Sequence, residues 1–182
     1  MNLRALTRVL VFVLSLVALS GCDNRHGGSA RDLDEATMAV LNTARALHHE
    51  ADVYESAGDF NAASGAIQRV LALRIPSSVA EAEDIRVDAW GRLAEIALMA
   101  DDPDHALAHA NSGLQDSHHE SVLRARLHVV RGRALRALAE RATANGDTTT
   151  AESRRREALD AFETSIEINQ RVLNQLADGG LR

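Results

Sequence analysis

Apolar residues recur along the chain at intervals of three and four, which is the period of an amphipathic helix. Six of them, separated by seven, four, three, four and three positions, form one stripe: Leu33, Val40, Ala44, Leu47, Ala51 and Tyr54. Four more continue the pattern at intervals of three, four and three: Phe60, Ala63, Ile67 and Val70. Ala, Leu, Glu and Arg are abundant, and no segment has the pattern of a strand. The chain is therefore predicted to be helical over most of its length.

Start and stop signals divide residues 32–177 into six predicted helices. Four sequences match the capping box, whose two side chains satisfy free backbone N–H groups of the first turn: Asp32–Glu35, Ser78–Glu81, Ser117–Glu120 and Thr149–Glu152. Three further breaks are Gly58-Asp59, Asp102-Pro103 and Asn145-Gly146-Asp147. The predicted helices span about 32–57, 59–75, 78–101, 103–116, 118–145 and 148–177. Six antiparallel helices predict an all-α domain with one continuous core, followed by a frayed tail at 178–182.

The first 22 residues have a different pattern. Arg4 and Arg8 precede an apolar stretch at 9–19, and small residues follow it up to Cys22, the only cysteine. This layout is typical of a secretory signal peptide, and the stretch is shorter than the roughly 20 apolar residues of a membrane-spanning helix. A single cysteine also excludes an internal disulfide. We expect residues 1–21 to be a signal peptide.

Leu19-Ser20-Gly21-Cys22 resembles the lipobox of bacterial lipoproteins. The resemblance implies that Cys22 receives a diacylglyceryl group on sulfur, becomes the first residue after cleavage, and is then acylated on its amine. Residues 22–31 would be the lipidated cysteine and a flexible tether, and the protein would be anchored in the bacterial cell envelope, facing the periplasm. Asp23 resembles the signal that retains lipoproteins in the inner membrane, and the outer membrane is the alternative. An ordinary signal peptide or an N-terminal anchor helix stays open.

The helices also repeat in pairs that resemble the tetratricopeptide repeat (TPR). The first match is at 54–73, with Tyr54, Gly58, Asp59, Phe60 and Ala63. The second, at 90–114, has Trp90, Leu93, Ala94, Ala97, Ala106 and Ala110, and the third, at 132–169, has Gly132, Leu135, Ala158, Phe162 and Ile166. The resemblance implies a TPR-like helical-hairpin repeat domain at 32–177. The alternative is an unrelated helical bundle.

The repeats depart from the family in three places. The positions taken as equivalent, Ala44, Val87 and Ala125, are 43 and 38 residues apart, against about 34 in the family. Asp101-Asp102 replaces the usual Gly-Asp at the second turn. Residues 136–157 exceed the family's turn region, which predicts longer helices in the third pair.

The TPR resemblance implies that the first helix of each pair lines a concave groove that binds a protein partner. The positions carried over from the family are Arg45, His48, Asp52 and Glu55, then Asp88, Gly91 and Glu95, and finally Arg126, Val129, Arg133 and Arg136. The family's carboxylate clamp, built on Lys and Asn, is absent, so binding of peptide C-termini is not implied.

Charge is unevenly distributed. Residues 22–123 hold 7 Arg and 18 acidic residues, residues 124–156 hold 9 Arg and 3, and residues 157–182 hold 2 Arg and 5. Such asymmetry orients a protein partner, although many of these charges are expected on solvated helix faces. The acidic balance and the 3% aromatic content argue against nucleic acid as a partner.

Candidate chemistry is sparse. His105 and His109, four positions apart, are weak candidates for a metal site, since a site needs three or four ligands. The sequence contains no nucleophile motif, phosphate loop or dinucleotide loop. We therefore expect no cofactor, no evident small-molecule substrate and no enzyme activity. The preferred hypothesis is a lipid-anchored envelope scaffold or adaptor. The alternatives are an all-α envelope metal-binding protein or enzyme using His105, His109 and the Arg cluster, and a passive spacer.

Overall fold

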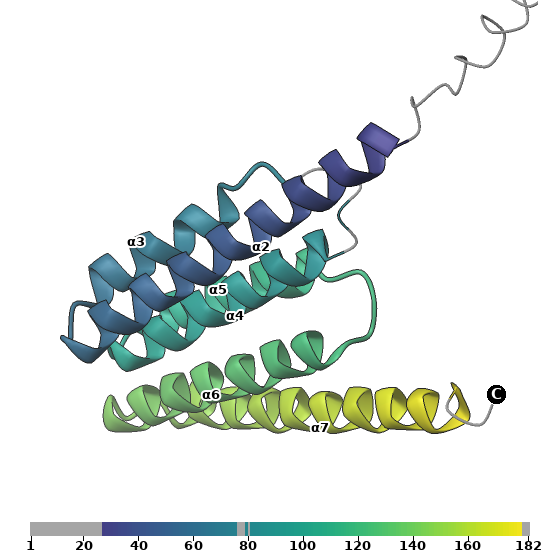
Figure 1. Cartoon of the computed structure of the whole chain (residues 1–182). Helices are drawn as coiled ribbons and strands as arrows, with labels where there is room; N and C mark the ends of the chain where they lie inside the picture. Colours follow the sequence, from purple (N-terminus) through teal and green to yellow (C-terminus); the bar gives the residue numbers. More distant parts are fainter. Residues whose placement is uncertain (1–26, 76–78, 80, 180–182) are drawn as a thin grey trace, which may run out of the picture. The chain divides into compact units, whose positions relative to one another are not determined.

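The structure, a computed structural model, describes residues 27–75, 79 and 81–179 (Figure 1). This part of the chain contains six helices and no strand: α2 (Gly27–Ser56), α3 (Phe60–Leu71), α4 (Ala82–Met99), α5 (Pro103–Asp116), α6 (Val122–Ala144) and α7 (Thr148–Gly179). The helices follow one another as three hairpins, α2–α3, α4–α5 and α6–α7. The predicted all-α helical-hairpin repeat fold is confirmed.

The chain divides into two compact units, residues 1–38 and 39–182. Of the first unit, the described residues are the N-terminal part of α2. The second unit holds the rest of α2 and all later helices, and the packing described below belongs to it. The predicted signal peptide at 1–21, the lipidated Cys22 and Asp23 lie outside the described residues.

The three hairpin turns share one geometry. In each turn a residue with positive φ precedes an aspartate, whose N–H donates to the carbonyl five residues earlier at 2.9 Å. The aspartate carboxylate accepts a hydrogen bond of 3.0 or 3.1 Å from the N–H three residues later, and so caps the second helix. The three pairs are Gly58–Asp59, Asp101–Asp102 and Gly146–Asp147. Asp101, at φ 57°, adopts the turn without glycine, because a short polar side chain tolerates this conformation.

Alanines occupy equivalent buried positions around each turn. Three lie seven residues before the positive-φ residue, and three lie four residues after the capping aspartate. All six are buried. A methyl side chain lets neighbouring helices approach closely while keeping helix propensity high. The six are Ala51, Ala94 and Ala139, then Ala63, Ala106 and Ala151.

Each hairpin packs on the one before it. Buried residues of α4, including Leu93, join those of α2 and α3 in one core cluster. From α6, Val130 packs with Ala94 of α4 and Ala110 of α5. The first helix of each later hairpin therefore contacts both helices of the preceding hairpin. This stacking of similar units on their neighbours distinguishes a repeat from a simple bundle.

α6 begins later than predicted because a different side chain caps it. The helix begins at Val122, and the Ser121 Oγ accepts the Arg124 N–H at 3.2 Å. The predicted cap, Ser117, instead follows the end of α5 in an extended conformation. The capping box predicted at Ser117–Glu120 is therefore wrong.

Other helix ends also differ from their predicted positions. Asp147 caps α7, so the box predicted at Thr149–Glu152 is wrong, and the helix continues to Gly179, past the predicted tail boundary at 178. α3 ends at Leu71 rather than 75, with Ala72 as its C-cap. α4 begins at Ala82 rather than 78, with no side-chain hydrogen bond at its N-cap.

α2 begins at Gly27 and not at the box predicted for Asp32. Residues 27–31 of the predicted tether are therefore helical. Once a helix has formed, each added residue gains a backbone hydrogen bond, and the sequence has no proline here to stop it.

The third hairpin differs from the expected alignment of equivalent positions between the repeats. The positive-φ residues at 58, 101 and 146 lie 43 and 45 residues apart, so the turns align Ala44 and Val87 with Gly132. The expected alignment with Ala125 is wrong, because α6 has 23 residues against 18 in α4. The predicted lengthening of the third pair is confirmed, with α7 reaching 32 residues.

Candidate functional site

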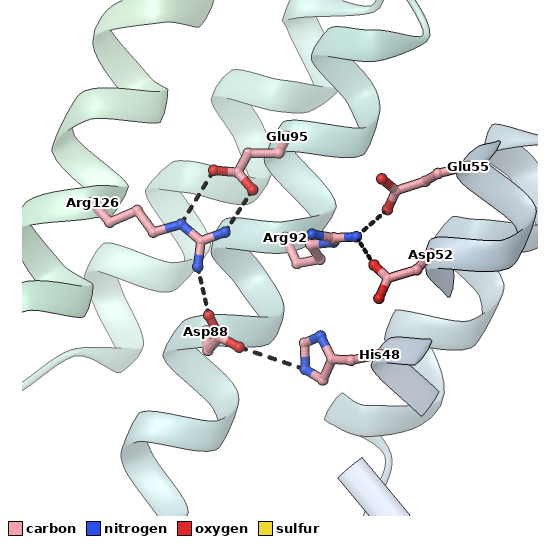
Figure 2. A network of polar contacts seen from close by, with 7 residues as sticks. All are labelled: His48, Asp52, Glu55, Asp88, Arg92, Glu95 and Arg126. Carbon is pink, nitrogen blue, oxygen red and sulfur yellow. Dashed lines mark hydrogen bonds and ion pairs between the residues drawn. The ribbon is translucent and has the colours of Figure 1, made fainter. Parts of the chain in front are cut away.

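Charged residues at the same spacing line one side of α2 and of α4. Three residues on each helix are separated by four and then three positions, which places them on one face. Arg126 of α6 completes the set, and Figure 2 shows that the side chains point toward one another from three different helices. We call the following seven residues the polar network: His48, Asp52, Glu55, Asp88, Arg92, Glu95 and Arg126.

Arg126 joins α6 to α4 through two carboxylates. Its Nε and Nη2 donate to the two oxygens of Glu95 at 3.1 and 2.6 Å, and its Nη1 donates to Asp88 Oδ1 at 2.7 Å. Two parallel bonds to one carboxylate are the strongest arrangement open to a guanidinium. The hydrogen bonds to Glu95 raise the pKa of Arg126 against the opposing effect of burial.

Arg92 joins α4 to α2 in the same way. Its Nη2 donates to Glu55 Oε1 at 2.8 Å and also to Asp52. The Arg92 and Glu55 side chains are 24% and 15% exposed, so water screens this pair less than a surface pair. The two arginines thus link the first helices of all three hairpins.

His48 closes the network beside Asp88. Its Nε2 lies 3.5 Å from Asp88 Oδ2, while the other oxygen of Asp88 accepts from Arg126. Burial lowers the pKa of His48, although Asp88 opposes this effect and Arg92 adds to it. With His48 neutral, four carboxylates face two guanidinium groups, and the network carries surplus negative charge.

The structure brings together six of the nine charged or histidine residues predicted for the groove, namely all of the polar network except Arg92. Arg45 lies outside it, exposed and within 3.3 Å of Asn42 Oδ1. Arg136 is also exposed, 3.6 Å from Glu140 on its own helix. Arg133 is exposed and has no ion pair among the described residues.

Arg92 was not among the residues predicted from the sequence. The signal was present, because Asp88, Arg92 and Glu95 repeat on α4 the spacing of His48, Asp52 and Glu55 on α2. An arginine in the middle of such a set faces the acidic residues of the neighbouring helix once the two helices pack side by side.

The two histidines proposed as metal ligands lie on α5, with their ring centroids 6.3 Å apart. His105 Nδ1 lies 2.6 Å from Asp102 Oδ2, in the N-cap of the helix. The His109 ring stacks on Trp90 at a centroid distance of 5.8 Å, and burial lowers its pKa. Among the described residues, no group of three or more histidine, cysteine, aspartate or glutamate side chains is placed to hold a metal ion. A cavity of about 240 Å³ lies beside the pair, with Asn61, Ser64 and Gln68 of α3 in its lining.

Across the described ranges, the helices are too short or too polar to cross a bilayer. No protein-family model, no curated protein and no solved structure matches the chain.

Proposed function

We propose that the protein is a lipid-anchored scaffold or adaptor of a bacterial cell envelope, which binds a protein partner on the surface formed by α2, α4 and α6 and performs no catalysis. The observation that carries this proposal is the polar network, which joins the first helix of every hairpin. A surface held by such links needs little ordering when a partner binds, and this lowers the cost of association.

The distribution of charge supports a protein partner. The network adds surplus negative charge to the surface, whereas Arg45 and Arg133, on α2 and α6, keep their charges exposed to solvent. A surface with both signs of charge at separate places favours one orientation of a charged partner. The resemblance of the hairpins to TPR repeats, whose first helices line a binding surface, agrees with this assignment.

The proposed lipid anchor is inferred from the lipobox-like sequence at 19–22. An acyl chain and a diacylglyceryl group together hold a protein stably to a bilayer, whereas one chain holds it only marginally. We expect the full chain to incorporate labelled palmitate and to sediment with membranes. Cys22→Ser should abolish the labelling. Labelling that persists in this variant would disprove the lipobox assignment.

The partner is sought by crosslinking in envelopes of the source bacterium. Wild type is compared with Arg45→Glu/Arg133→Glu, which reverses two exposed charges and leaves the network intact. Arg156→Glu on α7 is the matched control, because Arg156 is exposed and lies on a helix that is not one of the three first helices. We expect one protein to be crosslinked to wild type and to the control and to be lost with the double variant. Equal crosslinking to all three would place the binding surface elsewhere, and the absence of any specific protein would disprove the adaptor role.

A further inference from the structure

The outer face of the last hairpin is not covered by another helix of the described part of the chain. α6 and α7 are antiparallel neighbours (Figure 1). Arg155 Nη2 donates to Thr143 Oγ1 at 2.7 Å, the Phe162 ring lies against Gly132, and Arg171 pairs with Glu120 at 2.8 Å. These contacts fix the register of the two helices along most of the length of α6.

Two rows of exposed apolar residues follow this register. On α7, Leu159, Ile166 and Leu173 are spaced by seven residues and are 61%, 55% and 65% exposed. On α6, Val122 and Val129 have the same spacing and are 61% and 36% exposed. Since Gly132 lies at the level of Phe162, Val129 lies near the level of Ile166, and Val122 near that of Leu173. A spacing of seven residues keeps each row on one side of its helix, as in a coiled coil.

A cavity of about 480 Å³ continues these rows toward the hairpin turn. Its apolar lining comes from both helices: Ala139 of α6, and Ala158, Leu159 and Phe162 of α7. Arg136, Glu140 and Arg155 also line it. We call the two apolar rows and this cavity together the terminal face.

The earlier hairpins show what covers such a face. α4 packs against α2 and α3, and α6 packs against α4 and α5. No described residue covers the equivalent surface of α6 and α7, as the exposure of its five large apolar side chains shows. In this fold, the element that fits a hairpin's outer face is an amphipathic helix.

The charge around the terminal face selects the kind of helix. At the cavity, two arginines, Arg136 and Arg155, stand against one carboxylate, Glu140. Arg155 forms no ion pair among the described residues. A second copy of this chain would bring the same arginines together, and like charges in an interface are unfavourable. A helix with acidic edges would neutralise them.

We propose that the terminal face binds an amphipathic helix of another protein, with leucine or isoleucine residues on its apolar side and aspartate or glutamate residues along its edges. The interface would bury the rows of α6 and α7 beneath the partner's apolar stripe, and the carboxylates of the partner would pair with Arg136 and Arg155. This surface is distinct from the polar network. If this proposal is disproved, the proposed function is unaffected, because the variants used below do not change any residue of the polar network.

The test uses the full chain in phosphatidylcholine vesicles and two fluorescent peptides. Each peptide has about three heptads with leucine at positions a and d. One peptide carries glutamate at e and g, and the other carries lysine. We expect the acidic peptide to bind at least about tenfold more tightly, a difference of about 1.4 kcal/mol. Ile166→Glu and Leu159→Glu should each weaken binding of the acidic peptide by about tenfold or more. The reason is that burial of one leucine or isoleucine side chain contributes at least the free energy of a tenfold change in affinity.

Val53→Glu is the matched control. Val53 is 68% exposed on α2, and its replacement should leave the peptide affinity unchanged. Four results would overturn the proposal. One is equal affinity for both peptides, and a second is no effect of Ile166→Glu. Another is a concentration-dependent dimer in sedimentation that Ile166→Glu abolishes, which would make a second copy the occupant. The last is binding that appears only when the vesicles contain anionic lipid, which would assign the face to a membrane.

Discussion

The ring of Phe162 lies so close to Gly132 that a Cβ on residue 132 would come within 2.6 Å of Phe162 Cε1. α7 can approach α6 at this height because α6 has no side chain there. Both residues belong to the third predicted repeat, and their contact explains why the repeat requires a small residue in the middle of a helix, where glycine is otherwise unfavourable.

Gly132→Ala should lower the free energy of unfolding by about 1–3 kcal/mol, because the ring must move out of a packed position. Chemical denaturation followed by circular dichroism measures the change. Gly65→Ala is the matched control, since Gly65 lies inside α3 with no atom within 4 Å of an added Cβ. There the substitution should stabilise the protein by about 0.5–1 kcal/mol through helix propensity. A stable Gly132→Ala protein would show that α6 and α7 separate easily.

The bond between Arg126 and Glu95 should contribute more than a surface ion pair. A double-mutant cycle with Arg126→Gln and Glu95→Gln should give a coupling energy of about 1–2 kcal/mol, because the guanidinium is bidentate and only 37% exposed. The same cycle on Arg69 and Glu50, a pair with 62% and 38% exposure, should give about 0.2–1 kcal/mol. Equal coupling energies would show that the polar network contributes no special rigidity.

The turn at Asp101 should tolerate glycine better than the native aspartate. At φ 57°, a Cβ costs up to about 1–2 kcal/mol relative to glycine, and the short polar side chain of aspartate offsets only part of this strain. Asp101→Gly should therefore raise Tm, and Gly58→Ala, at φ 76°, should lower it. Thermal unfolding of both variants measures the pair of effects. A decrease in Tm in both variants would indicate that the Asp101 side chain stabilises the turn by more than its backbone strain costs.

Stability should fall in mildly acidic solution because of three partly buried histidines. Burial lowers the pKa of His48, His109 and His128, so the folded protein binds protons more weakly than the unfolded chain. The difference in proton binding contributes to stability, and this contribution is fully present above about pH 6.5, the pKa of an imidazole in the unfolded chain. It is lost as the pH falls below that value toward the lower pKa values of the folded protein. Tm should therefore decrease between about pH 7.5 and pH 5.

His109→Phe tests this origin of the pH dependence. The variant keeps an aromatic ring against Trp90 but cannot be protonated, so Tm should depend less on pH than in wild type. An unaltered slope in His109→Phe would mean that other groups cause the acid sensitivity.

Much of the fold could be predicted from the sequence because the hairpin turns are encoded locally. Gly58-Asp59 and Asp102-Pro103 carry their own backbone and capping chemistry, and the structure places both as expected. The boxes at Ser117 and Thr149 failed because a nearby Ser121 or Asp147 offers a competing cap. A sequence window contains both candidates and does not decide which carboxylate or hydroxyl reaches the free N–H.

The network was predictable in its members but not in its pairing. Spacing places Asp88 and Glu95 on one face of α4, and the same reasoning applies to His48 and Asp52 on α2. The link from Arg126 to α4 depends on how far α6 slides along its neighbour, which is decided by packing at residues such as Val130. That sliding distance is not encoded in a local pattern.

The stacking of each hairpin on its predecessor means that contacts between helices join elements adjacent or nearly adjacent along the chain. A chain with such low contact order folds quickly, since few long loops must close before native contacts form. The first two hairpins can therefore assemble before the third is complete. For the lipid-anchored protein proposed above, which would cross a membrane as an extended chain, this would limit the time during which the alanine-rich core is exposed.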